Sequence, residues 1–218
     1  MGFNGYVTAP AFYLIIAFSC LITYGIYWGI RHNRRILFSV FNSLIAVVKP
    51  DEQTFTNIGG YVGCHANLYP REESPIVQVD ATLTLLPRHA WLYMPVSILI
   101  MRYDRLFVTV HVKPRLPGEG HLIETKYAGF RGPEITNAWK MSRDTIRWGR
   151  HDFHLYYDTY KVRDRLNGFI RQNPDPGAVR HIALVPHQRK GFVFLIPGEG
   201  RVDLSFAPVY EWMTSLAA

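Results

Sequence analysis

Histidines are the residues of this 218-residue chain that most readily suggest chemistry, because nine of them are present. Imidazole binds metal ions and transfers protons near neutral pH. His151 and His154 have an HxxH spacing, and His181 flanks a predicted strand. On a strand, residues three apart face opposite sides of the sheet, so His151 and His154 do not converge on one ion. The sequence therefore indicates neither a metal site nor a bound cofactor.

Motifs of covalent and acid–base catalysis are weak. Cys64 and His65 are neighbours in the chain, which does not place their side chains in a productive hydrogen bond. Glu72 and Glu73 lie in a segment typical of a solvated turn, and GxSxG, GxGxxG and Walker motifs are absent. We expect a non-enzymatic protein. The alternatives are a membrane-tethered enzyme acting at the lipid surface, built around the histidines named above, and an assembly or insertion factor for membrane proteins.

Basic residues are the second chemical feature, since the formal net charge is +7 and favours an anionic partner. Four of them fall three to four residues apart, which on a helix gives one stripe: Lys140, Arg143, Arg147 and Arg150. Such a stripe is either an ordinary solvated face or a contact for anionic lipid headgroups or an acidic subunit. Nucleic acid is not expected, because its recognition needs aromatic residues in a basic groove and the sequence offers only scattered candidates.

The first thirty residues predict the element that positions these groups. Ala11–Ile30 is almost wholly apolar, and twenty helical residues span about 30 Å, the thickness of a hydrocarbon core. Tyr27 and Trp28 lie at its far end, where such rings prefer the headgroup level. A basic flank follows directly: Arg31, Arg34 and Arg35. Because no charged side chain precedes the helix, we expect the N-terminus outside and the domain in the cytoplasm, on an inner, cytoplasmic-type membrane.

Two further apolar stretches are too short to span a membrane. Ile36–Val48 has the pattern of a juxtamembrane amphipathic helix, which lies either at the membrane surface or on the domain's own core. Ala90–Met101 is interrupted by Pro95. It is either a buried, kinked helix or a surface that enters the headgroups or meets a partner subunit.

The remaining chain predicts an α+β fold with antiparallel hairpins. Alternation of apolar and polar residues predicts a strand at Ile76–Leu86. Further strands are expected at Leu106–Val112, Leu122–Tyr127, Phe153–Tyr157, His181–Val185, Phe192–Ile196 and Val202–Phe206. Helices are expected at Glu134–Trp148, Tyr160–Gln172 and Pro208–Leu216. The near-identical segments Leu116–Gly120 and Ile196–Gly200, each ending in PGEG, indicate two similar hairpin turns or a duplicated strand–turn–strand–helix unit.

The domain organisation follows from these elements. We expect a short extracytoplasmic N-terminus over 1–10, a transmembrane helix over 11–30, a juxtamembrane helix over 31–50 and a cytoplasmic α+β domain over 51–218. This layout, confined to the first 35 residues or so and to topology, resembles the H subunit of purple-bacterial photosynthetic reaction centres. The resemblance implies an accessory subunit of a bioenergetic complex, photosynthetic or respiratory. The partners we expect are integral membrane subunits and anionic lipid headgroups.

Overall fold

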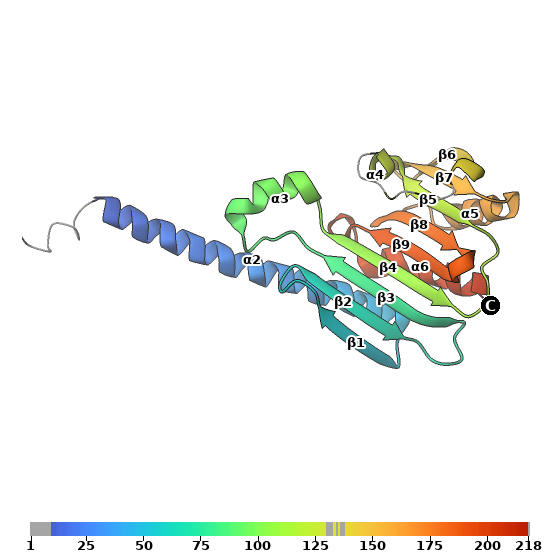
Figure 1. Ribbon diagram of the computed structural model, residues 1–218, viewed down its shortest axis with the longest axis horizontal. Helices are drawn as coiled ribbons and strands as arrows, with labels where there is room; N and C mark the ends of the chain where they lie inside the picture. Colours follow the sequence, from blue (N-terminus) through green and yellow to red (C-terminus); the bar gives the residue numbers. More distant parts are fainter. Residues whose placement is uncertain (1–9, 130–132, 134, 136–137, 218) are drawn as a thin grey trace, which may run out of the picture.

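A single long helix, α2 (Pro10–Val48), leads into the sheet domain (Figure 1). The computed structural model describes residues 10–217 except 130–132, 134 and 136–137, so the predicted N-terminal segment before Pro10 lies outside the described residues. The predicted span and the predicted juxtamembrane helix are parts of α2, which runs through the basic flank without a break. Neither Gly nor Pro occurs between Arg31 and Val48, so nothing in that stretch interrupts the helical hydrogen bonds. The helix ends at Val48; Lys49, whose φ is 49°, and Pro50 follow it.

The two halves of α2 have different surroundings. From Pro10 to Trp28 the side chains are mostly exposed, and the window most suited to crossing a membrane is 0% buried. In the second half Val40, Phe41, Leu44 and Val48 are buried in the domain core, against α6 (Val202–Ala217) and the sheet. Of the two positions predicted for Ile36–Val48, the structure therefore shows the one on the domain's own core.

In the described part of the chain, nine antiparallel strands form one sheet, which confirms the α+β prediction. The strand order is β1-β2-β3-β4-β9-β8-β5-β7-β6. The strands are β1 Glu52–Asn57, β2 Gly63–Tyr69, β3 Ile76–Thr84, β4 Arg105–Val112, β5 Gly120–Glu124, β6 Ser142–Trp148, β7 His151–Tyr157, β8 Val179–Val185 and β9 Lys190–Leu195. After β4 the chain forms β5, β6 and β7 at one end of the sheet. It then returns with β8 and β9, which lie between β4 and β5.

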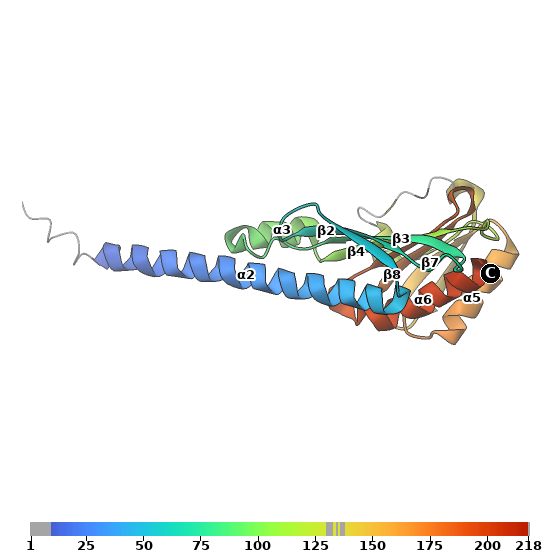
Figure 2. The same ribbon diagram turned by 90° about the horizontal axis from the view of Figure 1, so that it is seen from below.

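Helices α2, α5 (Tyr160–Gln172) and α6 lie on the same side of the sheet (Figure 2). The core lies between them and the sheet, because alternate strand residues are fully buried, as in β4. The shorter helices are η1 Trp91–Tyr93, α3 Met94–Met101, α4 Thr125–Gly129, η2 Ala138–Lys140, η3 Pro186–Gln188 and η4 Pro197–Glu199.

Two secondary-structure predictions are wrong, and a third is wrong in its last part, because residues 125–127 of the predicted strand Leu122–Tyr127 belong to α4 and not to β5. The predicted helix Glu134–Trp148 contains η2 and strand β6 in its described part, and β6 pairs with β7. Charges four apart fit the alternation of a strand as well as a helical stripe, so their spacing did not decide between the two. The predicted strand Val202–Phe206 is the first part of α6. Pro208 lies inside this helix and not at its start. The buried residues of α6 recur at helical spacing on both sides of it: Val202, Phe206, Val209, Met213 and Ala217.

Neither PGEG segment forms a hairpin, so the predictions of matching hairpins and of a duplicated unit are wrong. The first connects β4 with β5, which do not pair, and the second connects β9 with helix α6. Turn chemistry sets local backbone geometry, whereas the pairing of strands is decided by the core. In the first segment, a Cβ on Gly118 would lie 2.5 Å from Val162 Cγ2, so the glycine permits close approach of α5.

Candidate functional site

The junction between the exposed and the buried half of α2 is the most distinctive site of the molecule. Asn33, which is fully buried, donates from Nδ2 to the carbonyls of Leu86 (2.8 Å) and Tyr61 (3.0 Å). Its Oδ1 accepts from Arg88 Nη1 at 3.0 Å. Every polar atom of this amide is therefore satisfied by a segment more than twenty residues away, and the helix is held to the sheet domain at this point.

Asp104, directly before β4, completes this connection. Its carboxylate accepts from Arg88 Nη1 at 2.9 Å and Nη2 at 2.8 Å, and also from the backbone N–H of Leu86 at 2.8 Å. The Asp104 side chain is 6% exposed, so the bidentate pair is largely shielded from water. We call Asn33, Arg88 and Asp104 the latch.

The aromatic and basic residues predicted at the end of the span lie beside the latch. Tyr27, Trp28, Arg31, Arg34 and Arg35 are all exposed on α2. The Arg31 guanidinium donates to the Tyr27 hydroxyl at 3.4 Å, and that of Arg34 lies 5.1 Å from the centre of the Tyr61 ring. The structure thus brings this predicted set together, directly where the apolar half of α2 ends.

The Ala90–Met101 segment meets α2 at the same level. It forms η1 and α3, and only Ser97 of their residues is buried, so the predicted buried helix is wrong. We call its exposed side chains Leu92, Tyr93, Val96, Ile98 and Leu99 the α3 surface. The segment contacts α2 through Trp91, which packs against Gly25.

The other predicted basic set is not a stripe. Lys140 lies in η2, Arg143 and Arg147 point to one side of β6, and Arg150 lies in the turn before β7. Arg143 donates to His154 Nε2 at 2.8 Å, and its guanidinium lies 5.7 Å from the Tyr156 ring. Because β6 is the edge strand opposite β1, these residues are not brought together with the basic residues of α2 (Figure 1).

A buried carboxylate that the sequence did not reveal lies under the β6–β7 end of the sheet. Glu124 accepts from His151 Nδ1 at 2.8 Å and lies 3.2 Å from Arg180 Nε. His151 and Arg180 also line a cavity of about 570 Å³ together with Arg150 and Asp175. His154 projects from the other side of β7 toward Arg143, so the prediction that His151 and His154 diverge is confirmed.

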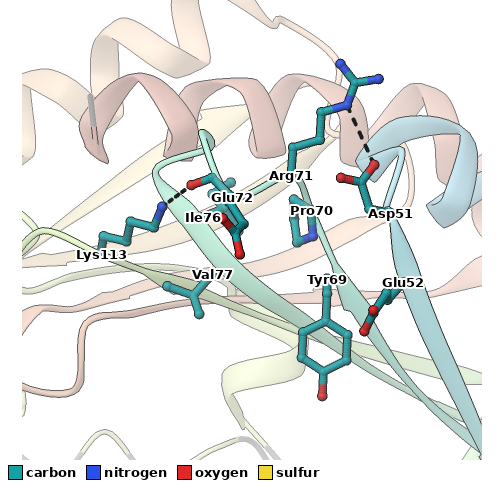
Figure 3. Close-up of a pocket in the computed structure, with 9 residues that line it drawn as sticks. All are labelled: Asp51, Glu52, Tyr69, Pro70, Arg71, Glu72, Ile76, Val77 and Lys113. Atoms are coloured by element: carbon teal, nitrogen blue, oxygen red, sulfur yellow. Dashed lines mark hydrogen bonds and ion pairs between the residues drawn. The ribbon is translucent and has the colours of Figure 1, made fainter.

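A second cavity is lined by charged and polar residues at the other end of the sheet. This cavity of about 640 Å³ lies beside the carboxyl end of α2, where Figure 3 shows Arg71 paired with Asp51 at 3.6 Å and Lys113 donating to the carbonyl of Glu72. These are exposed charges, which interact weakly in water. Within the described residues, no three His, Cys, Asp or Glu side chains gather as ligands for a metal ion.

Two histidines share a buried position on the opposite side of the sheet from α5 and α6. The rings of His121 and His181 are 5.7 Å apart, and the Phe192 ring lies 5.4 Å from that of His181. Burial, reinforced by the neighbouring His121, lowers the pKa of His181 to about 3. Burial also lowers the pKa of His121, although Glu119 opposes the shift.

These histidines predict a loss of stability in acid. A histidine whose folded pKa lies below its unfolded value takes up a proton on unfolding, so its contribution is lost as pH falls from about 6.5 toward 3. The slope is at most about 1.4 kcal/mol per pH unit for one group. We expect His181→Phe to flatten the dependence of the unfolding free energy on pH between 6 and 4, measured by denaturant titration in detergent micelles. The exposed His187→Gln is the control, and an equal slope in both variants would contradict the assignment.

Comparison of the sequence with known protein families finds no matching family model, and comparison with curated proteins finds no match.

Proposed function

We propose that this chain is a non-enzymatic, single-pass accessory subunit of a larger integral membrane complex. The observation that carries the proposal is the continuity of α2. Its first half is apolar, exposed and long enough to cross a bilayer, and its second half is part of the core of the sheet domain. In such a chain, the orientation of the membrane span determines the orientation of the sheet domain.

The latch supports this proposal because it prevents the sheet domain from moving independently of α2. A tethered enzyme reaches its substrates through a flexible linker, whose ends move independently. Here Asn33 is bonded to the segment before α3, and no linker separates the span from the domain. Fixed orientation is useful to a protein that must fit against neighbours.

The surface of the apolar half suits neighbours in a membrane. The hydroxyls of Ser19 and Thr23 donate to the carbonyls of Ile15 and Ser19 within the helix, at 2.8 and 2.9 Å. Their polar hydrogens are therefore satisfied without a partner, and the whole circumference is compatible with lipid or with another helix.

Orientation, location and class of complex follow from charge and layout. The arginines after Trp28 favour a cytoplasmic domain and an external N-terminus on an inner, cytoplasmic-type membrane, and they suit anionic headgroups as a second partner. The layout resembling the reaction-centre H subunit supports a bioenergetic complex, photosynthetic or respiratory.

Purification from membranes tests the proposal. The tagged full chain, extracted in mild detergent, is expected to carry integral membrane partners in a fixed ratio, measured by mass spectrometry. Phe18→Ala combined with Leu21→Ala should lower the recovered partner severalfold, because both side chains are exposed on the apolar half. Leu204→Ala, at a position on α6 that is also exposed, should not lower it. A lone 25.1 kDa species would refute the proposal, and partners in variable, substoichiometric amounts would favour an assembly factor instead.

A further inference from the structure

The α3 surface has no partner among the described residues, although it is strongly apolar. No charged residue occurs between Trp91 and Met101. Leu92 is 61% exposed and Leu99 is 82% exposed. A helix that docks on a protein normally presents one apolar stripe and a polar back, whereas this one is apolar around its circumference. Exposing such a surface to water is costly, so it requires an apolar environment.

The position of the segment indicates which environment that is. A Cβ on Gly25 of α2 would lie 2.5 Å from Trp91 Cδ1, so the segment begins in direct contact with α2. That contact lies within the last turns of the apolar half, next to Tyr24 and Trp28, which are exposed. Figure 1 shows α3 beside the middle of α2, on the side of the domain from which the apolar half extends. The α3 surface is thus continuous with a surface already suited to lipid.

The charges at the other end of the segment agree with a membrane. Arg102, directly after α3, is exposed, and Arg105 donates to the carbonyl of Met101 at 3.1 Å. Arginines at the end of an apolar helix are well placed for phosphate groups, as are the arginines that follow the apolar half of α2.

We propose that the Trp91–Met101 segment inserts into the same membrane leaflet as the carboxyl end of the apolar half of α2, with the Leu92 end deeper and Arg102 among the headgroups. This inference rests on the proposed function only in that α2 crosses the bilayer. Two insertions at separate points fix the rotation of the domain about α2 as well as its height. A second copy of the chain, or a partner protein, would be the competing occupant of the α3 surface.

Depth-dependent fluorescence tests the insertion. The full chain, with Cys20→Ala and Cys64→Ala, receives one cysteine at a time by Leu92→Cys, Leu99→Cys, Leu21→Cys or Leu204→Cys. Each is labelled with an environment-sensitive dye and reconstituted into vesicles of phosphatidylcholine and phosphatidylglycerol. Leu21 reports on α2, and Leu204 is a matched control because it is exposed on α6.

Insertion predicts quenching by nitroxide lipids at positions 92 and 99 that is at least about threefold stronger than at 204, since the apolar face of an interfacial helix lies about 5–10 Å into the boundary between headgroups and acyl chains. Iodide in the water should quench in the reverse order. If position 21 responds to lipid quencher but 92 and 99 respond to iodide, the inserted segment is refuted and the anchor stands. Protection from both quenchers would mean that a second copy covers the α3 surface, which also refutes insertion. If position 21 itself ignores the lipid quencher, the membrane anchor fails.

Discussion

Replacing Asp104 by asparagine is expected to lower the free energy of unfolding of the full chain by about 3 kcal/mol. The carboxylate accepts both Nη atoms of Arg88 and the backbone N–H of Leu86, and it is 6% exposed. Asparagine is nearly isosteric and keeps one acceptor oxygen, but it leaves the Arg88 guanidinium without a counter-charge in a site shielded from water. Denaturant unfolding in detergent micelles, followed by tryptophan fluorescence, measures the loss.

The matched control is Asp51→Asn, which removes an aspartate paired with Arg71 at 3.6 Å. There both side chains are largely exposed, at 61% and 78%. A pair in water contributes little, so a change of no more than about 0.5 kcal/mol is expected. Equal effects of the two substitutions would show that the latch is as solvated as a surface pair and does not hold α2 in place.

The elements that could be predicted from the sequence are those with a strong internal period or firm ends. The predicted helix Tyr160–Gln172 matches α5 residue for residue, because its apolar side recurs at helical spacing and Asn173 and Pro174 stop it. The predicted strands in β3, β4, β7, β8 and β9 are confirmed because their alternation reflects burial on one or both faces.

Elements defined by their partners could not be found in this way. Strand β1 reads EQTFTN and is exposed along its whole length, so it has no apolar period to detect. It is a strand because every residue pairs with β2, from Glu52 with Tyr69 to Asn57 with Cys64. The same reasoning applies to β6, where the pairing with β7 outweighs a charge spacing that also fits a helix.

The latch was missed for a related reason. Asn33 lies in the middle of a helix, where asparagine is mildly unfavourable, and its acceptor on Leu86 is 53 residues away. No residue close to Asn33 in the sequence predicts that contact. One signal was present, since the side-chain amide of an asparagine between Arg31 and Arg34 on an otherwise amphipathic helix needs hydrogen-bond partners. The aromatic and basic residues around it were predicted as a membrane interface from residue type and position alone, since such interfaces favour these residue types independently of the fold. The structure places them together on α2, and their contact with lipid stays a prediction.

Gly29→Ala is expected to be the most disruptive substitution of a single methyl group in α2. A Cβ at this position would lie 2.2 Å from the carbonyl oxygen and 2.3 Å from the carbonyl carbon of Arg88, and 2.4 Å from the amide nitrogen of His89. These are backbone atoms of the segment that carries the latch, so no side-chain rotation relieves the overlap. The segment must move away from α2, which strains the hydrogen bonds of Asn33 with Leu86 and Arg88. We expect a loss of about 3 kcal/mol of unfolding free energy.

Gly168→Ala provides the control, because it makes the same chemical change inside helix α5 with nothing within 4 Å of the added Cβ. Alanine is the better helix former, so this variant should gain about 0.5–1 kcal/mol. The two substitutions thus have opposite expected signs, measured in the same denaturant titration. A second readout separates movement of the segment from general loss of stability, since limited proteolysis under native conditions should cleave Gly29→Ala between β3 and β4 before it cleaves the rest of the domain. If Gly29→Ala is as stable as the parent chain, the close packing of α2 against residues 88 and 89 is refuted, and with it the rigid connection on which the accessory-subunit proposal depends.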